Sequence, residues 1–133
     1  MAASHILVVD DEPDIRSLVQ DILADEGYQV ETAGGAAAAR AALRTRRPDL
    51  VLLDVWMPDT DGISLLREWS QDGRPPMPVV MISGHGTIET AVEATRLGAY
   101  DFIEKPISLA KLLLTVERAL EASRLQQENE GLK

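Results

Sequence analysis

The run Leu50-Val51-Leu52-Leu53-Asp54 constrains the fold of this chain more than any other stretch. Its apolar residues are followed by one carboxylate, and turn-forming residues come soon afterwards. Short continuous apolar runs are typical of strands that are buried on both faces, and such strands occur in parallel sheets. We therefore expect Asp54 to end a central strand of a parallel sheet.

Strand-type runs alternate with helical segments along the whole sequence. The other expected strands span residues 6–9, 28–33, 78–82 and 100–103, and the expected helices span 14–26, 36–46, 63–69, 87–97 and a long segment that follows Ser108 as its N-cap. This alternation predicts an α/β fold with a five-stranded parallel sheet and helices on both faces. Right-handed crossovers favour a doubly wound order, and the flavodoxin-like order 2-1-3-4-5 brings the ends of strands one and three together.

Length and composition limit the classes of protein to consider. The 133 residues suffice for one domain with a core, and the hydrophobic fraction of 45% is that of a globular protein. The formal net charge of −9 argues against unaided binding to nucleic acid and suits a cation or a basic partner. The absence of cysteine excludes disulfides and thiolate metal sites. Without a signal pattern or a long uncharged apolar run, we expect a soluble, cytoplasmic protein with no membrane partner.

Polar side chains follow four of the five expected strands. Asp10 and Asp11 follow the first, Asp54 ends the third, Ser83 follows the fourth and Lys105 follows the fifth. Helix caps or solvated turns explain each residue separately, but they do not explain why these groups share one edge of the sheet. Ligands of open α/β sheets bind at that edge.

The charges of this cluster indicate its ligand. Three carboxylates at close range repel one another, and a divalent cation removes the repulsion. Oxygen ligands without His or Cys favour Mg²⁺, with Mn²⁺ as a substitute. Lys105 then offers a second positive group to an incoming anion, and Ser83 offers a hydroxyl. A carboxylate flanked by Mg²⁺ and an ammonium is an arrangement for phosphoryl transfer.

Two other functions compete with this interpretation. A Mg²⁺-dependent phosphohydrolase with an aspartyl nucleophile usually has a second Asp shortly after the first, but Trp56 occupies that position here. A flavodoxin-like nucleotide or flavin binder needs a phosphate-cradling turn after the first strand, where this chain has acids instead.

Several motifs together resemble the receiver domain of two-component response regulators over about the whole chain. They are Val8-Val9-Asp10-Asp11-Glu12-Pro13, Asp54 with Met57-Pro58 and Asp61-Gly62, Ser83-Gly84-His85-Gly86, and Gly98-Ala99-Tyr100-Asp101-Phe102 before Lys105-Pro106. Within this family, residues 81–86 and 102–106 resemble transcriptional regulators of the NtrC and NtrX type.

The resemblance implies a role for each residue of the cluster. Asp54 is expected to accept a phosphoryl group from a sensor histidine kinase, which makes the domain a signalling switch rather than an enzyme. Asp10, Asp11, Asp54 and the backbone carbonyl of Trp56 are expected to hold the Mg²⁺. Ser83 and Lys105 are expected to contact the bound phosphoryl group, and the Lys105–Pro106 peptide is expected to be cis.

The same resemblance implies how the signal leaves the site. Ser83 and Phe102 are the expected switch pair, and the responding surface consists of the fourth helix, the fifth strand and the fifth helix. A homodimer is expected through that surface or through the C-terminal helix, where Leu125 and Leu132 are spaced as in a coiled coil. Residues 1–122 are expected to form the receiver, and residues 123–133 begin a linker helix toward an ATPase domain acting with the alternative sigma factor and a DNA-binding domain. The receiver itself is expected to bind no nucleic acid.

The two histidines have different positions in this scheme. His85 lies beside the expected site and is a candidate for tuning hydrolysis of the aspartyl phosphate, although an exposed residue without a role explains it equally well. His5 precedes the first strand and is expected to take no part.

Overall fold

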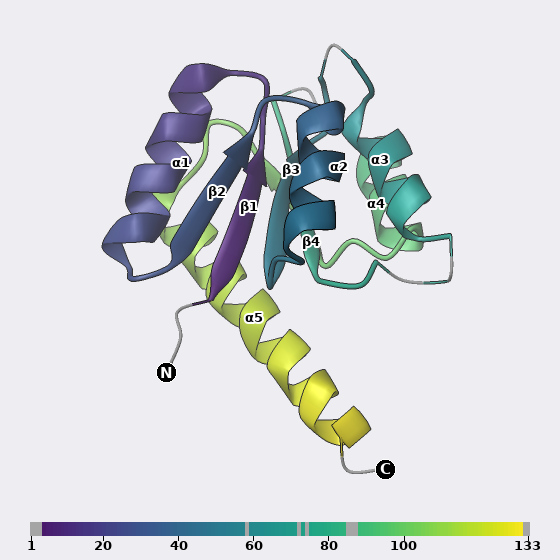
Figure 1. The fold of residues 1–133 in the computed structure, drawn as a ribbon. Coiled ribbons are helices and arrows are strands. Elements are labelled where there is room, and N and C mark those ends of the chain that lie inside the picture. Colours follow the sequence, from purple (N-terminus) through teal and green to yellow (C-terminus); the bar gives the residue numbers. More distant parts are fainter. Residues whose placement is uncertain (1–3, 58, 72, 74, 85–87, 132–133) are drawn as a thin grey trace.

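Strands and helices alternate strictly along the chain in the computed structural model (Figure 1). The structure describes residues 4–57, 59–71, 73, 75–84 and 88–131, with the backbone alone for 125–131. The elements are β1 (His5–Val9), α1 (Pro13–Asp25), β2 (Gln29–Ala33), α2 (Ala36–Thr45), β3 (Leu50–Asp54), α3 (Gly62–Trp69), β4 (Val79–Ser83), α4 (Ile88–Arg96), β5 (Asp101–Glu104) and α5 (Leu109–Gly131). Among the described residues, no helix has the length and apolar character needed to cross a membrane.

The five strands form one parallel sheet in the order β2-β1-β3-β4-β5. This is the doubly wound order that the sequence predicts, so the expected fold class is confirmed. β1, β3 and β4 are buried along their whole length, as their continuous apolar runs require. The strand order reverses at β1 and β3, because β2 is added on one side of β1 and the later strands on the other. The carboxyl ends of β1 and β3 therefore form the switch point of the sheet.

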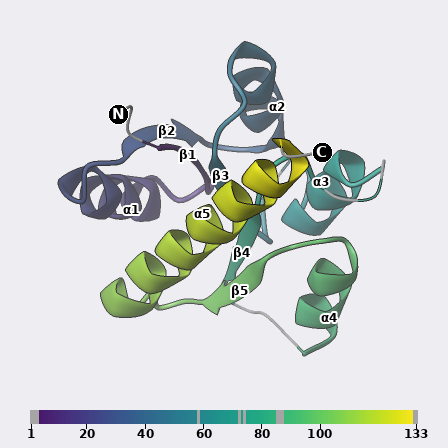
Figure 2. The ribbon, with the colours of Figure 1, turned by 90° about the horizontal axis from the view of Figure 1, so that it is seen from below.

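Helices cover both faces of the sheet (Figure 2). On one face, α2, α3 and α4 bury side chains that include Ala39, Leu65 and Ala94 against the alternate strand residues Leu7, Val51 and Met81. On the other face, α1 and α5 bury Val19, Leu23, Leu112 and Val116 against the intervening strand residues. The period of two along each strand thus divides the core into two layers, one on each side of the sheet.

The boundaries of several elements differ slightly from those expected. The last strand spans Asp101–Glu104 instead of residues 100–103. Its register explains the shift, because Asp101 pairs with Val80 and Glu104 with Ser83, so β5 ends where β4 ends. Gly27, at φ +93°, ends α1 as expected, with the Tyr28 N–H donating to the Leu23 carbonyl at 3.2 Å.

The final helix begins as the sequence predicts and continues beyond the sheet. Ser108 Oγ accepts the Lys111 N–H at 3.4 Å, which confirms Ser108 as the N-cap. In Figure 1 the C-terminal part of α5 extends past the amino ends of the strands, away from the edge where β1 and β3 end. The expected coiled-coil spacing cannot be followed here, because Leu132 and the side chain of Leu125 lie outside the described part.

Candidate functional site

The strand registers bring the expected site residues to one edge of the sheet. Val9 pairs with Leu53, so the next residues, Asp10 and Asp54, leave neighbouring strands at the same level. Asp54 in turn pairs with Ile82, which precedes Ser83. At the end of β5, Lys105 follows the pair of Ser83 with Glu104, and its N–H donates to the Ser83 carbonyl at 2.8 Å. Residues that are far apart in sequence thus gather at the carboxyl ends of four strands.

Four carboxyl groups lie in this cluster. Asp10 and Asp54 are almost completely buried, with 1% and 2% of their surface exposed, while Asp11 is half-buried and Glu12 is exposed. Carboxylate oxygens of Asp10, Asp11 and Glu12 all lie within 4.8 Å of one another. Asp11 also acts on Asp54, because a hydrogen-bonding interaction between the two side chains is one of the causes that raise the pKa of Asp54.

The buried acid at the end of β3 is strongly perturbed. Burial is the main cause that raises the pKa of Asp54 to about 7, and the negative charge of Asp10 adds to it. Lys105 opposes the rise, whereas the hydrogen bond and the charge of Asp11 reinforce it. Without a further positive charge, the Asp54 carboxylate is therefore costly to form near neutral pH.

Lys105 provides the positive charge of the cluster. Its Nζ lies 3.1 Å from Asp10 Oδ2, 3.0 Å from Glu12 Oε1 and 3.8 Å from Asp54 Oδ1. Burial lowers the pKa of Lys105, but the hydrogen bond to Glu12, the close contact with Asp10 and the charge of Asp54 together raise it by more, so the net direction is upward. Lys105 is therefore charged, and it pairs with the acids of the β1–α1 turn more closely than with Asp54.

Glu12 is the member of the cluster that the sequence analysis did not assign to the site. A signal was available, because Glu12 continues the acidic run Asp10-Asp11-Glu12 immediately before Pro13. Its side chain is 58% exposed yet reaches Lys105, so it extends the acidic surface toward solvent.

The remaining expected residues surround this cluster. Ser83 is buried at the end of β4. The next residue, Gly84, is exposed, and a Cβ added to it would lie 3.6 Å from the aliphatic chain of Lys105, which is an ordinary contact distance. Trp56 is 53% exposed two residues after Asp54. Phe102 is half-buried in β5 and packs on the core layer of α2, α3 and α4. The Lys105–Pro106 peptide is cis, as expected. His85 lies outside the described residues, and His5 is buried at the start of β1, far from this edge.

The donor set of the cluster fits a hard divalent cation. Asp10 Oδ2 is buried and lacks a hydrogen bond of good geometry, although it lies 3.1 Å from the Lys105 ammonium. Carboxylate oxygens dominate the cluster, and burial together with the neighbouring Asp10 and Asp11 raises the pKa of Asp54, which disfavours its charged form. Oxygen donors of this kind favour Mg²⁺, and a bound Mg²⁺ would offset the negative charge that they bring together.

Replacing Lys105 by Met should change metal affinity in the opposite direction to stability. The metal-free protein should unfold at a lower denaturant concentration, because the carboxylates lose their counter-charge. Mg²⁺ should bind at least about fivefold more tightly, because a competing positive charge near 4 Å is worth about 1 kcal/mol or more. Titration calorimetry and urea unfolding measure the two effects. The control Lys111→Met removes the same charge from the exposed side of α5 and should change neither Mg²⁺ affinity nor stability. Weaker Mg²⁺ binding by the Lys105 variant would show that Lys105 does not compete with the cation.

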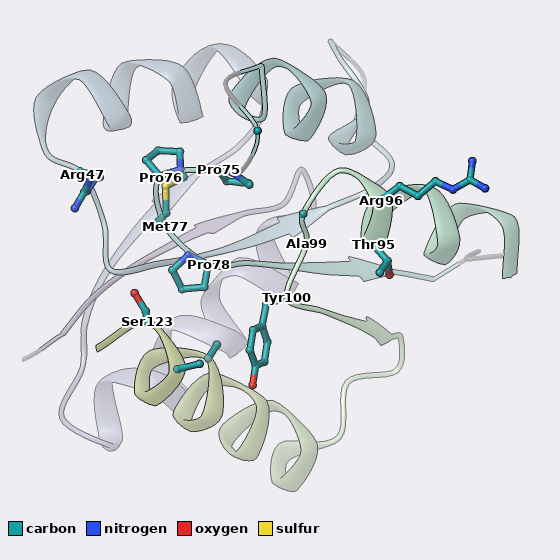
Figure 3. A pocket seen from close by; sticks show the side chains of 14 residues that line it. Arg47, Pro75, Pro76, Met77, Pro78, Thr95, Arg96, Ala99, Tyr100 and Ser123 are labelled. Atoms are coloured by element: carbon teal, nitrogen blue, oxygen red, sulfur yellow. The ribbon is translucent and has the colours of Figure 1, made fainter. Parts of the chain in front are cut away.

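A hollow of the described surface lies away from this cluster. An open hollow of about 750 Å³ lies near the amino end of β4, lined by the segment Pro75–Pro78, the α4–β5 turn and α5 (Figure 3). Arg47 and Arg96 lie at its opposite ends in Figure 3 and do not converge on a common point. The hollow therefore offers no focused site for a ligand, and the chemistry belongs to the other edge of the sheet.

Fold and cluster together define a class of protein. The family model described as response regulator receiver domain matches residues 6–117. The chain belongs to this family, whose members are signalling switches rather than enzymes. Membership decides against both the phosphohydrolase and the flavin-binding alternatives.

Within the family, the chain is similar to regulators of the NtrX kind. It is 53% identical to the nitrogen assimilation regulatory protein NtrX of Azorhizobium caulinodans, over 98% of this chain and 29% of that protein. The crystal structure of the receiver domain of NtrX from Brucella abortus superimposes with a TM-score of 0.81 and is 58% identical, over 87% of this chain and 98% of that one. A CheY-like receiver domain protein from Methanospirillum hungatei is 31% identical with a TM-score of 0.87, over 93% and 98% of the two chains. The chain thus spans less than a third of the length of the curated NtrX protein.

Proposed function

We propose that Asp54 accepts a phosphoryl group from a phosphohistidine of a sensor histidine kinase, with Asp10, Asp11, Asp54 and the Trp56 carbonyl as ligands of Mg²⁺. The observation that carries the proposal is the convergence of Asp54 with the buried Asp10 and with Lys105, whose Nζ is 3.8 Å from Asp54 Oδ1. A phosphoacceptor needs a carboxylate that is shielded from bulk water and flanked by positive charge.

The reaction follows from the groups around Asp54. A carboxylate oxygen of Asp54 attacks the phosphorus atom, the phosphorus–nitrogen bond to the imidazole breaks, and the imidazole nitrogen leaves with the bonding electron pair. Mg²⁺, when bound, supplies the positive charge that favours the ionised form of Asp54 and offsets the charge of the phosphoryl oxygens. Lys105 pairs with the transferred group after leaving Asp10 or Glu12, and the Ser83 hydroxyl hydrogen-bonds it.

The transferred group changes the charge of a buried site, and a movable element must respond to it. We assign this role to Ser83 and Phe102. Phe102 pairs with Met81 in the sheet and is half-buried, so an inward rotation of its ring would bury apolar surface that is now exposed. Phe102 lacks a hydroxyl that could hold the inward arrangement, which suits a switch that reverses easily.

The surface formed by α4, β5 and α5 is the proposed output surface. Large apolar side chains are exposed there: Ile88, Val92, Tyr100, Leu109 and Leu114. Such exposure is costly in an isolated domain and favours a dimer or another partner on this surface. We assign residues 1–122 to the receiver and residues 123–133 to the start of a linker helix. The helix α5 crosses residue 122 without interruption. We propose that the receiver belongs to a cytoplasmic, sigma-54-dependent transcriptional regulator.

The proposal is tested by exposing the protein to a small phosphodonor such as phosphoramidate. The intact mass should rise by one phosphoryl group in the presence of Mg²⁺ and should not change in the presence of EDTA. Release of phosphate from small phosphate esters with turnover would instead support a hydrolase, and an unchanged mass under both conditions would overturn the proposal.

A further inference from the structure

The turn between β2 and α2, Gly34–Gly35, lies between two charged side chains, Arg16 of α1 and Asp59 of the β3–α3 turn. On one side, Arg16 Nη1 of α1 donates to the Asp10 carbonyl at 2.7 Å. A Cβ added to Gly34 would lie 3.2 Å from the same Nη1. The Arg16 guanidinium therefore fills the space between the acidic β1–α1 turn and Gly34.

On the other side, Asp59 holds the start of α2. Its carboxylate accepts the N–H groups of Ala36 and Ala37 at 3.1 and 3.2 Å. Gly35 is the N-cap of α2 and has no side chain to do this. A Cβ added to Gly35 would lie 3.0 Å from both Asp59 oxygens, so the absence of a side chain there makes room for Asp59.

These contacts join the two segments that carry the proposed Mg²⁺ ligands. The β1–α1 turn carries Asp10 and Asp11, and the β3–α3 turn, which contains Asp59, follows Asp54 at the end of β3. Both turns are held against Gly34–Gly35, which itself contributes no ligand. We propose that Arg16 and Asp59 are positioning residues that set the distance between the two halves of the metal site through the Gly34–Gly35 turn. This inference rests on the proposed Mg²⁺ site.

Charge and position predict opposite effects at Arg16. Removing a positive charge near an acidic cluster should tighten Mg²⁺ binding through electrostatics alone. If Arg16 positions Asp10 and Asp11, its removal should weaken Mg²⁺ binding, as loss of outer-shell support usually does by about tenfold or more. The sign of the change therefore separates the two explanations.

The decisive variants are Arg16→Gln and Gly35→Ala. Gly35→Ala crowds Asp59 without changing any charge, and the backbone of Gly35 at φ −179° is extended, so alanine is not strained there. Both variants should bind Mg²⁺ about tenfold more weakly by titration calorimetry. Arg46→Gln removes an exposed arginine that contacts Gln29, and Gly27→Ala strains a helix end that has no neighbour within 4 Å; both controls should bind Mg²⁺ like the unmodified protein.

A readout without metal distinguishes this inference from the proposed function. In EDTA, hydrogen exchange at the Ala36 and Ala37 amides should accelerate in Arg16→Gln as well as in Gly35→Ala, because the shared turn loosens. Unchanged exchange together with unchanged or tighter Mg²⁺ binding in Arg16→Gln would overturn the positioning role. Failure of the unmodified protein to bind Mg²⁺ would refute the proposed function, and the exchange rates would still decide whether the turns are coupled.

Discussion

Asp54→Asn should gain no phosphoryl group under conditions that modify the unmodified protein, a loss of at least about 100-fold in initial rate. The amide that replaces the carboxylate is a poor nucleophile, and no other acid in the cluster is both buried beside Lys105 and placed at the end of the central strand β3. Intact mass after treatment with phosphoramidate and Mg²⁺ measures the loss. The control Asp21→Asn changes an exposed acid of α1 and should be phosphorylated normally. Phosphorylation of Asp54→Asn at the rate of the unmodified protein would show that another acid is the acceptor.

The same variant should be more stable than the unmodified protein without metal, and the difference should depend on pH. The folded protein holds the Asp54 proton up to about pH 7, whereas the ordinary value is 3.8. Between these values the folded state binds more protons than the unfolded state, so the free energy of unfolding falls as the pH rises and then levels off above about 7. The asparagine of the variant does not ionise, so the free energy of unfolding of Asp54→Asn should exceed that of the unmodified protein by about 1–3 kcal/mol at pH 8. Urea unfolding in EDTA should show equal stabilities below about pH 4.

Gly62→Ala should destabilise the folded protein more than any other glycine-to-alanine change in the described part of the chain. Gly62 begins α3, is buried, and donates its N–H to the Val55 carbonyl at 2.7 Å. An added Cβ would overlap the Asp54 carbonyl oxygen and lie 3.0 Å from Val55 Cα, so the backbone at the end of β3 must move. We expect a loss of about 3 kcal/mol or more in unfolding free energy, together with slower phosphorylation of the fraction that folds.

Gly73→Ala is the matched control for that variant. Gly73 has φ +115° and nothing within 4 Å of an added Cβ, so it tests backbone strain without overlap. It should lose about 1 kcal/mol and accept the phosphoryl group normally. Equal free energies of unfolding for the two variants would show that the β3–α3 turn can shift to accommodate the methyl group without loss of stability.

The sequence predicts the strand order and the gathering of the site residues because both follow from periodic patterns. Continuous apolar runs mark β1, β3 and β4 as buried strands, and parallel pairing then brings Asp10, Asp54 and Ser83 to the same edge. The positions of helix ends such as Gly27 follow from the backbone freedom of glycine.

Contacts of long side chains are less predictable. Lys105 has Asp10, Glu12 and Asp54 within reach, and its choice depends on distances that a pattern of residue types does not contain. Asp59 caps a helix 23 residues before it in sequence, where local capping rules point to Gly35 instead. Such partners are set by the packing of whole turns, which only the folded chain defines.

The continuation of α5 beyond the sheet converts small tilts into large displacements. Among the described side chains of α5, which extend to Arg124, the last buried one is Ala119, and the helix runs to Gly131. At 1.5 Å per residue, these twelve steps make a lever arm of roughly 18 Å. A rotation of about 10° at its pivot moves the tip by roughly 3 Å, enough to break or align contacts between two such helices. If the proposed switch at Asp54 turns α5 through a small angle, the tip of the helix would therefore carry that change far from the site.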